Sequence, residues 1–103
     1  MNRTIYKYPV PAVSPGAFEI ELPASSRVVA FGDDLDGELC VWAWIDPTEK
    51  EMHRQRFVLV WTGQHVGSHT TWLYVGRAVH DGLIWHLLAA ATTRNIVAGA
   101  VLP

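Results

Sequence analysis

Histidine is the residue type that most readily suggests chemistry in this chain, which contains five histidines among 103 residues. His65 and His69 are four residues apart, the spacing that places two metal ligands on one face of a helix. Gly63 and Gly67 lie before and between them, and glycines at such positions favour a loop. The single cysteine, Cys40, is far away in the sequence. We therefore predict ordinary loop histidines here and no metal site.

His86 is the second candidate for acid–base chemistry, and it follows Trp85 in a segment that alternates in character. Hydrolytic catalysis would require a hydroxyl or thiol nucleophile within hydrogen-bond reach of the imidazole. Ser68 and Thr70 are available, but the sequence has no nucleophile elbow, phosphate-binding glycine loop or dinucleotide fingerprint. We expect His86 to be a hydrogen-bonded residue of a sheet. The sequence predicts no catalytic residue and no cofactor.

Three carboxylates lie within four residues, at Asp33, Asp34 and Asp36. They lack the ligand spacing of a calcium-binding loop and its distant glutamate. Asp36 precedes Gly37, a pair that supplies the positive φ angles of a tight hairpin turn. We interpret the three carboxylates as the solvated tip of a hairpin.

Tryptophan is the residue type that suggests binding, and five of them are many for this length. Roughly two or three are expected to fill the core, and the others to lie at an interface with a second copy or a partner. As an alternative, exposed aromatic rings would stack on nucleobases while arginines, including Arg27, bind the phosphates. The candidate binding residues combine these types: Trp61, Trp72, His65, Arg54, Arg56 and Arg77.

The elements that must position these side chains are short, and Gly, Pro and Asp signals separate them. The expected strands are residues 4–10, 17–23, 27–33, 38–45, 54–63, 70–80 and 83–88. Asp36-Gly37 and Asp81-Gly82 are expected to close hairpins, and Gly76 to mark a bulge. We predict an all-β domain, a small antiparallel sandwich or partly open barrel of about seven strands.

The strand expected over residues 38–45 determines how its two tryptophans are interpreted. Its residues alternate between two sets, Cys40, Trp42 and Trp44 against Val41, Ala43 and Ile45. Both sets are apolar, as in a strand that is central in a two-layer domain or buried against another subunit. We predict that Trp42 and Trp44 belong to the core and that Cys40 is a buried, unreactive thiol.

The length of the chain fits one domain, which we assign to residues 1–88, with residues 89–103 as a C-terminal extension. The extension is apolar and rich in alanine. Its composition fits a short helix, an added strand, a flexible tail or a self-association segment.

The net charge and the composition of the chain exclude some classes of binding partner. The formal net charge is −2 and 17% of residues are charged, so the chain lacks the basic surface that binds long nucleic acids. No stretch approaches the ~20 apolar residues of a membrane-spanning helix. The N-terminal residues do not resemble a signal peptide, and one cysteine gives no sign of an oxidising compartment. We expect a cytoplasmic protein without a membrane partner.

Several short motifs follow one another over residues 4–88: "TIYKYPV", "IELP", "LCVWAWID", "FVLVWTGQHV" and "YVGRAV-HDGLIWHL". In this order the motifs resemble a family of small, mostly uncharacterised tailed-bacteriophage proteins. The chain departs from that pattern at Gln64, which separates glycine from histidine, and after Leu88, where the family ends. The resemblance implies a phage gene and a small β-fold that acts in the cytoplasm of the infected cell, and it supplies no catalytic residue.

The leading functional expectation is a non-enzymatic phage protein that binds a host protein, as a counter-defence or host-takeover factor. Exposed aromatic residues would anchor the partner, with the Arg54–Arg56 edge and the His65 loop as the rim. One alternative is an oligomeric sponge that sequesters a cyclic-nucleotide immune signal in pockets between subunits. A further alternative is a minor structural component of the virion.

Overall fold

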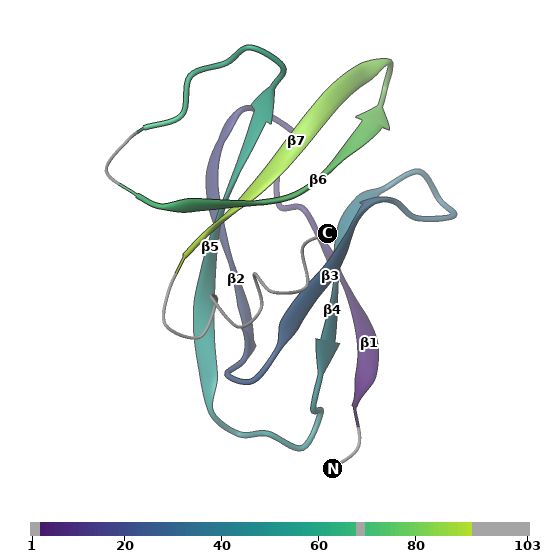
Figure 1. Ribbon diagram of the computed structural model, residues 1–103. Helices are drawn as coiled ribbons and strands as arrows, with labels where there is room; N and C mark the ends of the chain where they lie inside the picture. The colour runs from purple at the N-terminus through teal and green to yellow at the C-terminus, as the bar shows by residue number, and fades with distance from the viewer. Residues whose placement is uncertain (1–2, 68–69, 92–103) are drawn as a thin grey trace.

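The computed structural model describes residues 3–67 and 70–91, and within them every regular element is a β-strand (Figure 1). In chain order these are β1 (Thr4–Pro9), β2 (Gly16–Pro23), β3 (Arg27–Asp33), β4 (Leu39–Ile45), β5 (Met52–Trp61), β6 (Trp72–His80) and β7 (Leu83–Ala90). The prediction of an all-β domain is confirmed. No helix among the described residues is long and apolar enough to cross a membrane.

The strands form two open sheets that pack face to face as a sandwich, not a barrel. One sheet has the order β1-β4-β3 and the other has the order β2-β5-β7-β6, and all pairings are antiparallel. β5 and β7 differ in their bounds from the strands that the sequence predicts. β5 begins at Met52 because it pairs with Pro23 at the end of β2. β7 continues to Ala90 because its last residues still pair with β6, so the predicted extension begins within a strand.

The core lies between the two sheets and is built by the alternation of each strand. β4 contributes Val41, Ala43 and Ile45, which are at most 2% exposed, while Phe57 of β5 is fully buried. The Phe57 ring stacks on Phe18 of β2 with ring centroids 5.3 Å apart. This stack joins two neighbouring strands of the same sheet. Burial of one large apolar side chain contributes ~1.5–3 kcal/mol, so the burial of facing side chains from both sheets holds the two sheets together.

The β6–β7 hairpin forms as its sequence predicts. Asp81 and Gly82 both have positive φ, 51° and 77°, which is the geometry of a two-residue turn that matches the twist of the strands. His80 therefore pairs directly with Leu83. The register shifts between Tyr74 and Gly76, which confirms the predicted bulge.

The prediction that Trp42 and Trp44 belong to the core is wrong. β4 is the central strand of its sheet by hydrogen bonding, but only one of its faces meets the other sheet. The tryptophans lie on the opposite face, where Trp44 is 40% exposed and Trp42 is half-buried. A two-layer sandwich gives each sheet a single core face, and an apolar run in the sequence does not tell which face that is. Cys40 is buried, as predicted.

The tryptophans fill less of the core than the sequence predicts. Trp85 is 3% exposed and belongs to the core cluster, whereas Trp42 and Trp72 are half-buried and Trp44 and Trp61 are exposed. We expected roughly two or three tryptophans to fill the core. Smaller residues of β4, β5 and β7 occupy most of that volume. The molecule therefore presents large aromatic side chains on its surface.

Candidate functional site

Strand β5 alternates between the core and the surface from Arg54 to Leu59. Gln55, Phe57 and Leu59 are buried and point toward the other sheet. The buried Gln55 amide is satisfied because its Nε2 donates to the carbonyl oxygens of Arg56 and Ala90 at 2.9 and 3.2 Å. The intervening side chains point away from the core, onto what we call the outer face of the four-stranded sheet.

An apolar row crosses this outer face on all four strands. Cross-strand register aligns its members, which we call the apolar stripe: Ala17, Val58, Leu88 and Tyr74. The next row on the same face joins Val60, His86 and Arg77. Directly opposed residues of antiparallel strands share one face and contact each other, so these rows form one continuous surface. We call it the arginine face, after its polar and aromatic members Arg54, Arg56, Arg77, Trp72, Tyr74 and His86.

The arginines of this face differ in how they are paired. Arg54 lies 3.5 Å from the Glu19 carboxylate, and both side chains are exposed, so this ion pair contributes little to stability. Among the described residues, neither Arg56 nor Arg77 forms an ion pair. The apolar stripe therefore has an unpaired guanidinium on either side.

A hollow of about 320 Å³ opens on the arginine face beneath the loop that follows β5. Arg56, His65 and Trp72 line it together with Val58 and Val60 of the sheet. The Trp72 indole N–H donates to the carbonyl oxygen of Gly67 at 3.3 Å, which attaches the loop to β6. Three of the six residues that the sequence proposed for binding therefore meet at one site.

His86 joins three segments of this face. Its Nε2 lies 2.6 Å from the Thr62 hydroxyl, and its Nδ1 lies 2.8 Å from the Tyr74 hydroxyl. The imidazole thus connects the turn after β5 to β6 through a residue of β7. The prediction that His86 is a hydrogen-bonded sheet residue is confirmed, and the contacts identify it as a clamp that positions Tyr74.

Trp61 is the one proposed binding residue that lies away from the arginine face. It sits at the end of β5 directly opposite Trp85, and the two ring centroids are 5.7 Å apart. Trp85 points into the core. The Trp61 ring lies against Trp85 and covers this end of the core, while Trp61 itself is 47% exposed. The other half of the predicted histidine pair, His69, lies outside the described residues.

The hairpin tip between β3 and β4 is more structured than the sequence predicts. The sequence favours a solvated Asp34, yet its side chain is only 7% exposed and lies 2.7 Å from the Lys7 ammonium. Its other oxygen accepts the backbone N–H groups of Asp36 and Glu38 at 2.8 and 2.9 Å. The Lys7 hydrogen bond, followed by these backbone bonds, lowers the pKa of Asp34 to about 2. Asp33 also has a partner, the His80 ring at 2.7 Å.

The same tip brings Asp34, Glu38 and Cys40 within 4.8 Å of one another, a grouping of potential metal ligands. Asp34 already uses both oxygens for Lys7 and backbone N–H groups. Burial raises the pKa of the Cys40 thiol, which favours the protonated form that does not bind metals. These residues form a structural tip and do not fit a metal site.

The surface that the sequence reasoning missed is the outer face of the three-stranded sheet. Two of its rows are Ile5–Trp44–Arg27 and Lys7–Trp42–Ala30, each named in the order β1-β4-β3. The Arg3 guanidinium lies 5.9 Å from the centre of the Trp44 ring, within cation–π range. We call this surface the tryptophan face, with members Arg3, Ile5, Lys7, Arg27, Ala30, Trp42 and Trp44.

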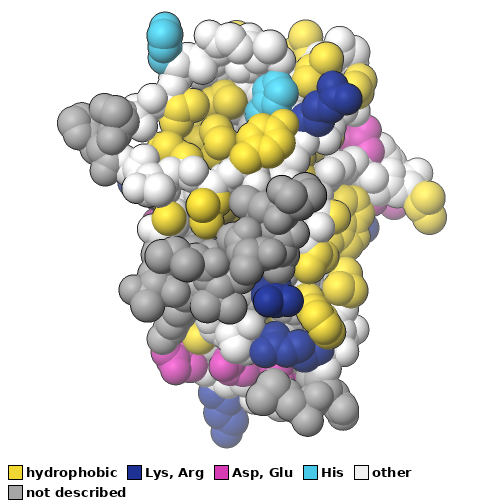
Figure 2. Space-filling model, in the orientation of Figure 1, with side chains coloured by type: hydrophobic (Ala, Val, Ile, Leu, Met, Phe, Trp, Pro, Cys, Tyr) yellow, Lys and Arg dark blue, Asp and Glu magenta, His cyan; other side chains and the backbone are white. Residues whose placement is uncertain are grey.

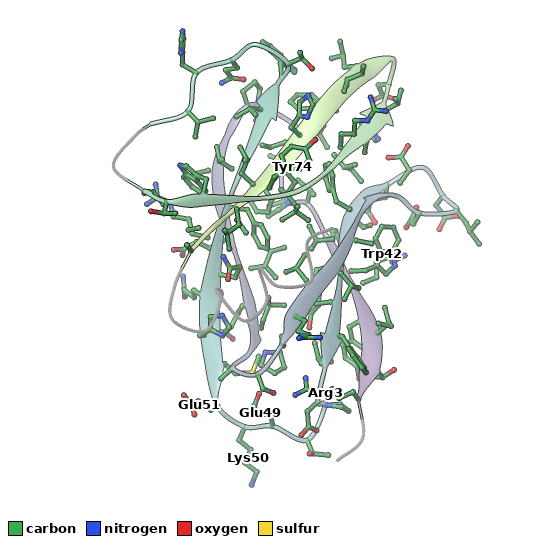
Figure 3. The ribbon with its side chains drawn as sticks, in the orientation of Figure 1. Arg3, Trp42, Glu49, Lys50, Glu51 and Tyr74 are labelled. Atoms are coloured by element: carbon green, nitrogen blue, oxygen red, sulfur yellow. The ribbon has the colours of Figure 1, made fainter. Side chains whose placement is uncertain are left out.

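Figure 2 shows hydrophobic side chains along the flank over β3 and β4, with Lys or Arg side chains beside their lower end. Trp42 lies toward the β3–β4 hairpin and Arg3 lies toward the other end of the same sheet (Figure 3). The signal that would have identified this face is in the neighbouring strands. Lys7 lies opposite Trp42 and Arg27 opposite Trp44, so charged residues share the face with the tryptophans.

A family model described as "Domain of unknown function (DUF7352)" matches residues 1–96, nearly the whole chain. The chain belongs to this family. No curated protein and no solved structure matches it. The description of DUF7352 names no activity and does not mention bacteriophages, so the phage origin that the sequence motifs suggest stays a proposal.

Proposed function

We propose that this DUF7352 protein is a non-enzymatic binding module that captures a protein partner on the arginine face. The observation that carries the proposal is the apolar stripe across all four strands, with the unpaired Arg56 and Arg77 beside it. Aromatic residues and arginines provide most of the binding energy at protein interfaces. The apolar stripe would form the centre of such an interface and the arginines its rim.

The exposure of the face supports this proposal. Tyr74 is 47% exposed, and beyond it on the β6–β7 hairpin the paired residues Val79 and Ile84 are 65% and 43% exposed. Figure 3 places Tyr74 on β6, toward the viewer. Contiguous exposed apolar surface with a polar border is typical of protein interaction sites.

Charge indicates the chemistry of the partner. Two guanidinium groups without an ion pair favour carboxylates on the facing surface, because arginine binds them through two parallel hydrogen bonds. We therefore propose a partner with an apolar anchor surrounded by acidic side chains. The resemblance to tailed-phage proteins makes this partner a host protein in the proposal, captured in the host cytoplasm as a counter-defence or host-takeover step.

The test is affinity capture from host-cell lysate, quantified by mass spectrometry, with wild-type protein and the double variant Arg56→Glu/Arg77→Glu. We expect one partner to be enriched by the wild type and lost by at least tenfold with the double variant. Lys50→Glu is the matched control because Lys50 is an exposed cation on the loop before β5 and is a member of neither outer face (Figure 3). Equal capture by the double variant and the wild type would reject the arginine face as the binding surface.

A second candidate function is capture of a small nucleotide, and the hollow beside β5 favours it. Trp72 would stack on the base while Arg56 and His65 bind the phosphate, and all three line the same space. Titration calorimetry with a panel of cyclic nucleotides tests this function. A saturable signal that Arg56→Ala weakens would support the sponge, and the absence of heat with every nucleotide of the panel would reject it.

A further inference from the structure

We propose that the tryptophan face is a dimer interface between two copies of this chain, related by a two-fold axis that crosses the strands close to Trp42. The inference does not depend on the proposed function, because it concerns the opposite side of the sandwich. It rests on the composition of the face and on the order of charges along it.

The centre of the face is apolar and open. Ile5 is 52% exposed, Trp44 is 40% exposed and Val29, which precedes Ala30 on β3, is 42% exposed. The register shift between Val28 and Ala30 brings this extra residue into the strand. Water contact with so much apolar surface is unfavourable, and an interface would remove it.

Apart from Lys7, which pairs with Asp34 in the same copy, the charges of the face are separated by sign along the strands. Arg27 and Arg3 lie at the end where β3 begins, beside Trp44. At the other end, beyond Trp42, the hairpin tip carries Asp33, Asp34 and Asp36. A surface with opposite charges at its two ends and an apolar centre is complementary to itself when one copy is turned end over end.

Two of the possible two-fold arrangements keep the strands of the two copies aligned, and the unpaired charges select one of these two. An axis parallel to the strands would place Arg27 of one copy near Arg27 of the second copy, which is unfavourable. An axis across the strands runs them antiparallel and places the basic end of each copy on the acidic end of the other. In this arrangement each contact occurs twice, so one complementary pair of charges stabilises the dimer at two places.

A hollow of about 450 Å³ provides the receptor for Arg27 of the second copy. Its lining includes Trp42, Asp36 and the ion-paired side chains of Lys7 and Asp34. An aromatic ring beside a carboxylate is a favourable environment for a guanidinium, which stacks on the ring and donates to the oxygens. Arg27 lies on the outer-face row next to Trp42, so an axis close to Trp42 carries it over the hollow of the other copy.

Arg27 and Asp36, the two residues that would meet across the interface, are each available for a new ion pair. Among the described residues, the carboxylate of Asp36 and the guanidinium of Arg27 have no ion-pair partner. Asp34 is already neutralised by Lys7, and Asp33 is bound to His80. The net charge of −2 is small, so overall repulsion between two copies is weak.

The test is sedimentation equilibrium of the full chain over a range of concentrations. The wild type is expected to form a dimer, while Arg27→Glu and Asp36→Arg each raise the dissociation constant by at least tenfold, because each places like charges together at both contacts. An equimolar mixture of the two variants is expected to recover the dimer, since every contact in the heterodimer then joins opposite charges. Circular dichroism checks that each variant keeps the fold, and Lys50→Glu is the matched control for a reversed exposed cation.

A wild type that is monomeric at every concentration would overturn the proposal. A dimer that neither substitution weakens would also overturn it, since another surface would then hold the copies together. Failure of the mixture to recover the dimer would exclude the antiparallel arrangement. Recovery cannot be explained by misfolding, because both variants are present unchanged in the mixture.

Discussion

The two outer faces of this sandwich use the same residue types in different orders. The arginine face carries an apolar stripe between the unpaired Arg56 and Arg77, and its three arginines outnumber the two glutamates, Glu19 and Glu21, that β2 places on the same face. The tryptophan face carries Trp42 and Trp44 between Arg27 at one end and an acidic hairpin tip at the other. The comparison teaches that aromatic content does not by itself identify the partner. An excess of positive charge favours a different, acidic molecule, whereas opposite charges at the two ends of a face favour a second copy.

The largest expected effect comes from breaking what both faces share. Phe57→Ala removes a fully buried ring that stacks on Phe18, which should lower the free energy of unfolding by ~3–5 kcal/mol. Chemical denaturation measures this loss. Both self-association and partner capture should weaken together in this variant, because each face is one side of a sheet that packs on the same core. A loss confined to one face would show that the faces do not depend on a common core.

Trp44→Lys should separate the two faces. It places a charge in the apolar centre of the tryptophan face, so the dimer should weaken by at least tenfold, which corresponds to about 1.4 kcal/mol. Partner capture by the arginine face should stay unchanged, and the melting temperature should move little because Trp44 is 40% exposed. Sedimentation and affinity capture of one preparation measure both properties. A parallel loss of partner capture would contradict independent faces.

His86→Phe should have a smaller effect, limited to the arginine face. The substitution removes the hydrogen bonds to Thr62 and Tyr74, which should cost ~0.5–1.5 kcal/mol of stability for each bond, at the low end because both lie near solvent. Amide hydrogen exchange should accelerate in the turn after β5 and stay unchanged in β1, β3 and β4. Thr62→Val is the matched control, since it removes only one of the two bonds. Equal exchange in wild type and His86→Phe would show that the imidazole is not a clamp.

The smallest expected effect is an acid response of the tryptophan face. The pKa of Asp34 in the folded protein is about 2, below its ordinary value of 3.8, so its stabilising contribution is complete above pH 3.8 and lost as pH falls toward 2. Asp34→Asn should flatten the stability profile across this interval, as should Lys7→Met, which removes the principal cause of the shift. Thermal unfolding at a series of pH values measures the effect. An unchanged acid limb in Asp34→Asn would rule out the Lys7 pair as its source.

Much of the fold follows from local sequence signals. The alternation of β2 places Ile20 and Leu22 in the core and its two glutamates outside, as predicted. Asp81-Gly82 forms the turn that its composition favours, because both residues tolerate positive φ. Each of these features depends only on residues that are neighbours in the sequence, so the sequence is enough to predict it.

The features that the sequence did not predict depend on contacts between strands that are distant in the sequence. Trp42 and Trp44 share an apolar strand with Val41 and Ala43, and only the pairing with β1 and β3 reveals which set meets water. The burial of Asp34 does not follow from its neighbours, because its partner, Lys7, is distant in the sequence. The convergence of Arg56, His65 and Trp72 likewise depends on how one loop lies over β5.

The most direct test of two separate faces is an NMR measurement on the indole N–H groups of the five tryptophans. We predict that dilution of the wild type shifts the signals of Trp42 and Trp44 and leaves that of Trp72 in place. Addition of the captured partner should shift the signal of Trp72 and leave the other two unchanged. Buried Trp85 should respond to neither. If dilution and partner shift the same set of signals, the molecule has one binding surface, which contradicts two faces with separate partners.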